Sequence, residues 1–200
     1  MLIAGVDEAG RGPLAGPVVA AAVVLPPRFR NAEITDSKQL SPEMREKLYK
    51  LITKRALHWS IVAVGHRRID KINILQASRL AMSLALRRIP ADKVLVDGNV
   101  PIETELPQET IVGGDASVLQ ISAASILAKV WRDRLMAALD KKYPGYGFGH
   151  NAGYPTPFHR KAIAVLGPCR IHRRTFGSVR SYAEIFDNPA AKASVVAQHS

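Results

Sequence analysis

An acidic pair set between two short apolar runs at the start of the chain constrains the fold most. The first run covers residues 2–6 and leads into Asp7 and Glu8, and the second covers residues 17–25. Between them, a Gly-Arg-Gly-Pro segment is the polar break. Runs this short, apolar and rich in β-branched residues are typical of strands buried on both faces. The tight connection therefore predicts a hairpin-like pair of strands.

The two acids set a condition on the first strand. Neighbouring side chains of a regular strand point to opposite faces of the sheet. Asp7 and Glu8 therefore serve one site only if the strand ends near Asp7 and the following glycines, Gly10 and Gly12, bend the backbone away. Glycines also leave the backbone bare enough for a ligand to approach closely. Their spacing and the strand that follows them exclude a dinucleotide-binding loop.

The remainder of the chain alternates expected helices and strands. We expect helices over residues 41–56, 69–88, 117–139 and 158–166, and strands over residues 59–64, 93–97 and 109–112. In the second of these helices, the apolar spacing turns Ile72, Leu75, Leu80 and Leu84 toward the core, with Ala77 as a further candidate. Early strands followed by strand-helix alternation predict an α/β fold, with one mixed five-stranded sheet flanked by helices.

The sequence changes in character at Tyr143, where glycine, proline and aromatic residues begin to alternate. We predict a main domain over residues 1–142, followed by a loop and a small, mostly helical C-terminal extension over residues 143–187. A flexible tail is expected over residues 188–200.

The charge balance indicates an anionic partner. The chain carries 28 Lys and Arg against 17 Asp and Glu, a net charge of +11. A basic surface of this kind attracts polyphosphates whatever their sequence, so nucleic acid is the first candidate.

Cysteine content and hydropathy restrict the remaining classes of protein. Cys169 is the single cysteine, which excludes an intrachain disulfide and a thiolate-rich metal site. No apolar run approaches the roughly 20 residues that a membrane-spanning helix needs. We therefore expect a cytoplasmic protein without a membrane partner, and a monomer.

Four acids are the candidate chemical centre. Asp7, with Glu8 beside it, and Asp97 each close an apolar strand, and Asp115 follows another. Open α/β sheets bind their ligands at such strand ends. Gathered carboxylates repel one another unless cations neutralise them, and Mg²⁺ or Mn²⁺ suit an all-oxygen set. Two such ions about 3.5–4 Å apart support phosphodiester hydrolysis.

Each acid also has a simpler interpretation. Asp7 and Glu8 could form a solvated turn, Asp97 could be a turn former, and Asp115 with Ser117 could cap a helix. Considered alone, Asp115 fits a cap better than a ligand. Acids at three strand ends of a basic chain together favour a metal-dependent nuclease.

Several motifs in a fixed order resemble the type 2 ribonuclease H family, and within it bacterial ribonuclease HII. The motifs occupy residues 6–16, 36–40, 96–99, 114–115, 121–130, 153–156 and 172–176. The resemblance covers about residues 2–180. The chain departs from the family pattern at Gly113, where members often have Lys, and at Ser178, where Pro is common. Neither departure touches the acids.

The resemblance implies a ribonuclease H-like fold and an endonuclease that cuts the RNA strand of RNA/DNA hybrids. It also implies nicking of DNA on the 5′ side of an embedded ribonucleotide, leaving 3′-hydroxyl and 5′-phosphate ends. The family's catalytic and metal-binding acids fall on Asp7, Glu8, Asp97 and Asp115, with Mg²⁺ or Mn²⁺ as the cofactor.

The resemblance further implies substrate contacts, to which the C-terminal extension contributes. The backbone of Gly10, Arg11 and Gly12 would read the ribonucleotide 2′-hydroxyl, the group that distinguishes RNA from DNA. Tyr154 would stack on the sugar of the next nucleotide, and Lys38 and Arg11 would contact phosphates. The alternatives are that Tyr154 anchors its glycine-rich loop and that Lys38 is a solvated surface residue.

Two other functional classes are considered. A non-catalytic RNA/DNA-hybrid binding module accounts for the basic charge and for Tyr154, but it has no use for clustered acids. A phosphotransferase using Gly10-Arg11-Gly12 as a phosphate loop lacks the Gly-Lys-Ser or Gly-Lys-Thr ending of a P-loop.

Overall fold

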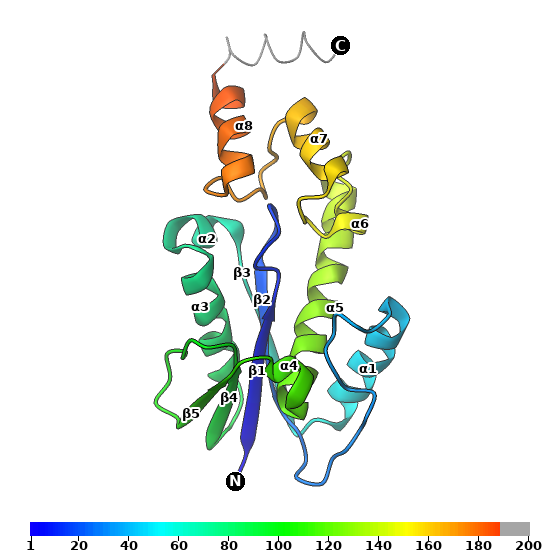
Figure 1. Ribbon diagram of the computed structural model, residues 1–200, viewed down its shortest axis with the longest axis vertical. Helices are drawn as coiled ribbons and strands as arrows, with labels where there is room; N and C mark the ends of the chain where they lie inside the picture. The colour runs from blue at the N-terminus through cyan, green and yellow to red at the C-terminus, as the bar shows by residue number, and fades with distance from the viewer. Residues whose placement is uncertain (189–200) are drawn as a thin grey trace. The chain divides into compact units, whose positions relative to one another are not determined.

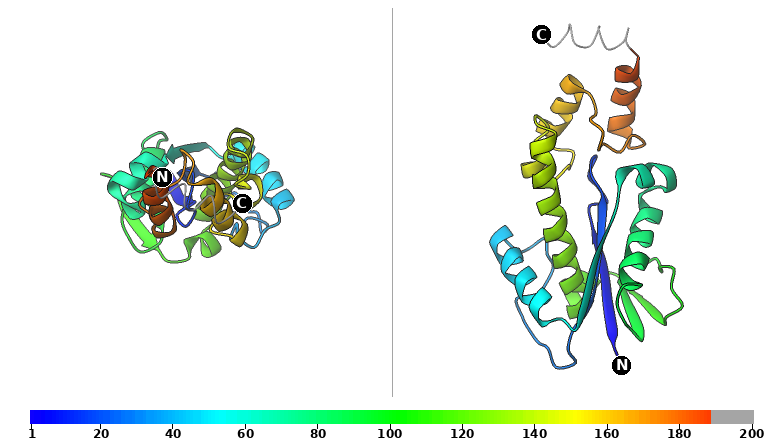
Figure 2. Two further views of the ribbon diagram at one scale, coloured as in Figure 1. Left: turned by 90° about the horizontal axis from the view of Figure 1, so that it is seen from above. Right: turned by 180° about the vertical axis from the view of Figure 1, so that it is seen from behind.

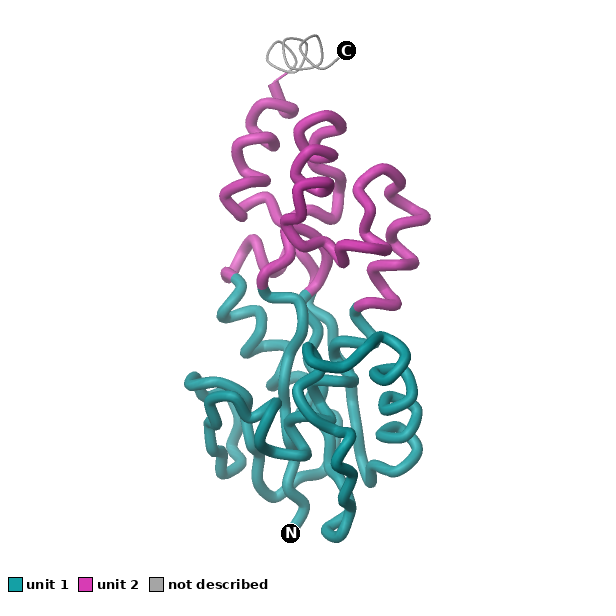
Figure 3. The backbone as a smooth tube through the Cα atoms, turned by 45° about the vertical axis from the view of Figure 1, so that its right-hand side comes forward, with its two compact units in different colours: residues 1–11, 18–64, 74–132 teal, residues 12–17, 65–73, 133–200 magenta. Residues whose placement is uncertain are grey.

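The computed structural model describes residues 1–188, which form two compact units (Figure 3). Unit 1 comprises residues 1–11, 18–64 and 74–132. Unit 2 comprises residues 12–17, residues 65–73 and the chain from residue 133 onward. Apart from Asn188, the predicted tail lies outside the described residues. The domain boundary expected after residue 142 stays a prediction.

Unit 1 contains the sheet. Its strands are β1 (Ile3–Ala9), β2 (Val18–Val24), β3 (His58–Val64), β4 (Lys93–Asp97) and β5 (Gln108–Ile111). Its helices are α1 (Pro42–Arg55), α3 (Ile74–Leu86), α4 (Gly114–Ser117) and α5 (Leu119–Lys142), of which the part up to Arg132 belongs to this unit.

Unit 2 is helical and has a core of its own. Its helices are α2 (His66–Ile72), α6 (Phe148–Asn151), α7 (Pro157–Leu166) and α8 (Gly177–Asp187). Its core gathers Leu14, Tyr146, Phe148, Ile163 and Val179. No helix within residues 1–188 has both the length and the apolar character required to cross a membrane.

The sheet has the strand order β3-β2-β1-β4-β5. β2 pairs antiparallel with β1 and with β3, whereas β4 runs parallel to β1 and to β5. The predicted mixed five-stranded sheet and its opening hairpin are thereby confirmed, with β1 at the centre.

Helices cover both faces of the sheet, with α3 on one side and α1 and α5 on the other (Figures 1 and 2). Every residue of β2 is buried, as its apolar sequence predicts. Val19, Ala21 and Val23 pack into the core with α1 and α5. On the α3 side, the Ser60 hydroxyl of β3 donates a hydrogen bond to the carbonyl oxygen of Ala85.

β1 continues further than expected. The prediction that it ends near Asp7 is wrong, because β1 stays paired with β2 through Glu8 and Ala9. The pairing of β1 with β4 stops earlier, at Val6 opposite Val96. Beyond that point β1 has a strand on one side only, so the acids lie where the β4 side of the sheet opens.

The helix expected over residues 69–88 is two helices, separated at Asn73. Asn73 has a positive φ of 64° with an extended ψ of 168°, a backbone conformation that a helix does not continue through. The expected inward face is also wrong for Leu75, which is 37% exposed. Ala77, the further candidate for the inward face, is fully buried, as is Ala81, because small side chains let α3 lie close to the sheet.

Gly5 lets α5 approach β1 closely. A Cβ atom at this position would lie 2.5 Å from the carbonyl oxygen of Gln120 and 2.5 Å from the backbone nitrogen of Ile121. These are main-chain atoms in the first turn of α5, so the helix would have to move away. Gly5 therefore fixes the start of α5 against the strand that carries Asp7.

Gly5→Ala is expected to destabilise the protein by about 1–3 kcal/mol, the usual range for overpacking a tight core. Urea unfolding followed by circular dichroism measures the change. Gly177→Ala is the matched control, because a Cβ there meets no atom within 4 Å and the position opens a helix. Equal stability of the two variants would contradict the close packing of α5 on β1.

Candidate functional site

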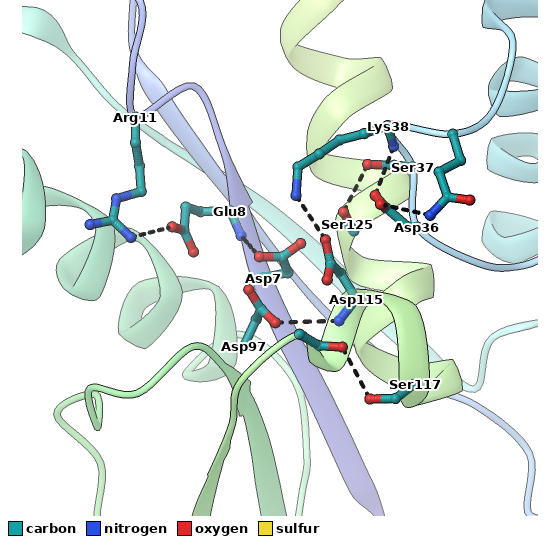
Figure 4. A network of polar contacts seen from close by, with 12 residues as sticks. Asp7, Glu8, Arg11, Asp36, Ser37, Lys38, Asp97, Asp115, Ser117 and Ser125 are labelled. Atoms are coloured by element: carbon teal, nitrogen blue, oxygen red, sulfur yellow. Dashed lines mark hydrogen bonds and ion pairs between the residues drawn. The ribbon is translucent and has the colours of Figure 1, made fainter.

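The parallel register of β1 and β4 brings the first two predicted acids together. Val6 lies opposite Val96, so Asp7 and Asp97 occupy the next positions on neighbouring strands. Asp115 comes from α4, which follows β5. Figure 4 shows these three carboxylates and that of Glu8 gathered at one place in unit 1. Asp7 and Asp115 are only 4% and 7% exposed.

Asp97 and Asp115 are joined directly. The backbone N–H of Asp115 donates to Oδ1 of Asp97 over 3.3 Å. Asp97 thus contacts a group 18 residues away, which a simple turn former does not do. Asp115 is no helix cap, since α4 is preceded by Gly113 and has no side-chain capping bond. Asp115 therefore does not cap α4, and Asp97 makes a contact beyond its own turn.

Two cations already reach the acids from the surface. Nζ of Lys38 lies 3.0 Å from Oδ2 of Asp115, and Nη1 of Arg11 lies 3.4 Å from Oε1 of Glu8. The side chains of both cations are more than half exposed, whereas the acids they meet are largely covered. Each of these exposed cations can therefore leave its carboxylate and bind another anionic group at the same place.

The pKa shifts of the acids reflect their burial and an excess of negative charge at the site. Burial raises the pKa of Asp7 well above its usual value, and the charges of Glu8 and Asp97 raise it further. Burial likewise raises the pKa of Glu8 and of Asp97, although Arg11 opposes the shift at Glu8. Asp115 adds to the shift at Asp97. Repulsion within the group is thus only partly balanced by the protein's own cations.

The donor set suits a hard divalent cation. All four side chains are carboxylates, and a cation among them would relieve the repulsion that contributes to the raised pKa values of Asp7, Glu8 and Asp97. Within residues 1–188, no three His, Cys, Asp or Glu side chains already stand at the spacing of ligands to one ion. Asp115 and Glu8 form ion pairs with Lys38 and Arg11, so a bound cation would replace these partners.

A short loop holds Lys38 in place. Asp36 forms an Asx turn by accepting the backbone N–H of Lys38 over 2.9 Å. The hydroxyls of Ser37 and Ser125 lie 2.9 Å apart and tie this loop to α5. Ser125 also hydrogen-bonds Asp7 and lowers its pKa, which opposes part of the effect of burial. Sequence reasoning assigned no site role to either serine, although both lie in motifs that resemble the family.

Gly10 is required by its surroundings. Its φ of 94° favours glycine, and a Cβ there would collide with the side chain of Arg132. Arg132 is 1% exposed, and its side chain packs against the backbone of Gly10. Sequence reasoning missed this arginine, because nothing in a long helix marks one basic residue as buried.

The other predicted substrate contacts belong to unit 2. A Cβ on Gly12 would lie 3.5 Å from Cε1 of Tyr154, so the tyrosine ring lies against this glycine. The ring is not packed away, because Tyr154 is 40% exposed. The structure thus gathers the four acids, Arg11 and Lys38 in unit 1, and pairs Gly12 with Tyr154 in unit 2.

Comparisons with known proteins agree on one family. Residues 4–179 match the model of the family described as Ribonuclease HII. Proteins of that name from Syntrophotalea carbinolica and Acinetobacter baylyi are each 54% identical over 182 residues. These matches cover 90% of this chain, and 87% and 96% of the respective relatives.

A solved structure supports the same grouping. The ribonuclease H2 from Pyrococcus horikoshii OT3 superposes with a TM-score of 0.78 at 31% identity. The match covers 94% of this chain and all of the other. The expected fold is thereby confirmed.

Asp7→Asn is expected to stabilise the protein at pH 7 in the absence of divalent cations. The folded state raises the pKa of Asp7 above its unfolded value near 3.8, so folding favours the protonated form. The stability that Asp7 contributes therefore falls as the pH rises from about that value through the folded pKa. The loss is about 1.4 kcal/mol for each pH unit between the unfolded and the folded pKa. Asparagine stays neutral and can still accept the Glu8 N–H that Asp7 accepts.

Urea unfolding at pH 7 and at pH 3.5 measures this difference. The gain should be present at pH 7 and shrink at pH 3.5, where Asp7 is protonated in the folded state and largely protonated in the unfolded state. Glu105→Gln serves as the control, because this acid is exposed. An Asp7→Asn protein less stable than the wild type at pH 7 would contradict the proposed repulsion.

Proposed function

Because the chain belongs to the ribonuclease HII family, we propose that it is an endonuclease that hydrolyses the RNA strand of RNA/DNA hybrids. We further propose that it nicks duplex DNA on the 5′ side of embedded ribonucleotides, leaving 3′-hydroxyl and 5′-phosphate ends. One observation carries this proposal: a basic chain gathers four carboxylates whose mutual repulsion is only partly balanced.

The four acids Asp7, Glu8, Asp97 and Asp115 would hold Mg²⁺ or Mn²⁺. Such ions, when bound, activate a water and stabilise the charge that develops on the scissile phosphate. The protein's part would be to bring the carboxylates close together, which the strand register and the Asp115 N–H support. A non-catalytic hybrid-binding module has no use for these acids, because they repel phosphate.

Lys38 and Arg11 would exchange their carboxylate partners for substrate phosphates. Both are exposed long side chains whose charged ends already lie at the acids. When cations take over the carboxylates, each side chain is released at the place where a phosphate must bind. The two ion pairs would thus keep the site organised before substrate arrives.

Recognition of the ribonucleotide would rest on the glycine-rich turn and on Tyr154. Gly10 and Gly12 leave the backbone of this turn bare, so its polar groups can approach a 2′-hydroxyl. The half-exposed ring of Tyr154 offers a flat face for stacking on the sugar of the next nucleotide. A monomeric state, a cytoplasmic location and a separate C-terminal extension go with this proposal as predictions.

Asp97→Asn is expected to reduce nicking of a duplex with one ribonucleotide by at least about 100-fold, because it removes a charged ligand. Gel electrophoresis of a labelled duplex in Mg²⁺ measures the rate. Binding, measured by fluorescence anisotropy, should stay within a few fold. Wild-type turnover by this variant would contradict the site assignment.

Metal removal separates the two functional classes. EDTA should stop cleavage by the wild-type protein, and added Mg²⁺ or Mn²⁺ should restore it. A protein that binds hybrids, cleaves none in either metal and is unaffected by EDTA would be the non-catalytic module.

Tyr154→Ala is expected to weaken the use of single-ribonucleotide duplexes more than Tyr154→Phe, since stacking needs the ring and not the hydroxyl. Loss of a stacking contact corresponds to roughly 5- to 100-fold in kcat/KM. Equal activity of the alanine and phenylalanine variants would contradict a contact between the Tyr154 ring and the substrate.

A further inference from the structure

Two histidines meet inside unit 2. His159, on α7, and His172 are both fully buried, and their Nε2 atoms lie 3.0 Å apart. Phe148 packs on His159 with a centroid distance of 5.3 Å, and Tyr146 packs on His172 at 5.1 Å. Aromatic rings thus surround the pair and separate it from water.

The outer nitrogens of the pair face backbone carbonyls. Nδ1 of His159 lies 2.9 Å from the carbonyl oxygen of Tyr154, and Nδ1 of His172 lies 3.3 Å from that of Cys169. A carbonyl oxygen only accepts, so a hydrogen bond at either end requires a proton on Nδ1. The contact between the rings requires a third proton, on one Nε2.

Two neutral imidazoles carry only two of these three protons. Burial lowers the pKa of His159, and lowers that of His172 to about 4, so the pair stays neutral at pH 7. The contact between Nδ1 of His172 and the carbonyl of Cys169 is the longest of the three, so we assign no proton to this nitrogen. Its carbonyl already accepts the backbone N–H of His172 over 3.1 Å.

This assignment leaves a directed chain of two hydrogen bonds. His172 donates from Nε2 to Nε2 of His159, and His159 donates from Nδ1 to the carbonyl of Tyr154. The acceptor role of Nε2 on His159 forces its proton onto Nδ1. The Nε2–H of His172 and the carbonyl of Tyr154 therefore favour the same tautomer of His159.

The chain ends at the Tyr154 backbone, which is fixed on both sides. The N–H of Tyr154 donates to the carbonyl of Asn151, and its own carbonyl also accepts the N–H of Thr156. The ring is exposed, so the backbone determines where the ring is presented.

The same pair also supports the partner of that ring. His172 forms a β-bridge with Ala15, and the next residue, Arg173, donates its N–H to the carbonyl of Leu14. The N–H of Leu14 in turn donates to the carbonyl of Gly153, beside Tyr154. One buried pair thus contacts both segments that bring Gly12 and Tyr154 together.

We propose that His159 and His172 are positioning residues for ribonucleotide recognition: the Nε2–H of His172 and the Tyr154 carbonyl together set the tautomer of His159, which holds Tyr154 against Gly12. This inference rests on the proposed role of Tyr154 at the substrate. It assigns a task to two buried side chains that lie outside the acid cluster and touch no reacting atom.

Nitrogen-15 NMR of the imidazoles tests the tautomer without reference to activity. At pH 7 the wild type should show His159 protonated on Nδ1 and unprotonated on Nε2. His172→Gln, whose amide replaces the Nε2 donor, should keep this signature, and His172→Phe, which removes that donor, should show a larger Nε2-protonated fraction. An Nε2-protonated His159 in the wild-type protein would overturn the proposal.

Kinetics test the consequence for the substrate. Asn places an amide donor where Nδ1 of histidine stands, so His159→Asn should rescue much of the defect of His159→Leu. On a duplex with one ribonucleotide, His159→Leu should raise KM roughly 3- to 10-fold, the usual effect of losing one hydrogen bond, and leave kcat within twofold. Thermal melting of both variants identifies any loss of folded protein.

A double mutant separates positioning from a general structural role. Adding His159→Leu to Tyr154→Ala should raise KM no further, because the ring to be positioned is gone. Fully additive effects, or a wild-type KM for folded His159→Leu, would overturn the proposal. If the wild type cleaves no duplex, the proposed function fails, and the NMR result still decides whether the tautomer is fixed.

Discussion

Repulsion among buried carboxylates is the constraint on which the site depends. Asp7, Asp97 and Asp115 would separate in a flexible chain, and three features of the main chain hold them together. These are the parallel register of β1 and β4, the close approach of α5 at Gly5, and the N–H that Asp115 donates to Asp97. The apolar core around the site stabilises the fold, and this stability offsets the free-energy cost of the buried charges.

The cations at the site complete this arrangement. Lys38 and Arg11 lie on exposed side chains and compensate only part of the charge, which leaves the acids able to bind a stronger cation. Surface ion pairs of this kind contribute at most about 1 kcal/mol each, so they are readily exchanged. The same ion pairs would therefore contribute to both metal binding and substrate binding.

Local sequence patterns predicted much of this structure. The apolar runs identified β1, β2 and β4, and acids at their ends identified Asp7 and Asp97. The length of β1 was not predictable, because it depends on β2 continuing to pair beyond Asp7. Two side-chain contacts were also not predictable from the sequence: that of Ser37 with Ser125 and that of His159 with His172. They join residues that are 88 and 13 positions apart. Only the fold brings such residues together.

Anomalous diffraction from crystals grown with Mn²⁺ and an RNA/DNA hybrid tests the central claim most directly, since it locates the ion without relying on activity. We expect a manganese peak bounded by the carboxylates of Asp7, Asp97 and Asp115, with Lys38 released from Asp115. A crystal with hybrid bound and no manganese among these carboxylates would contradict the account.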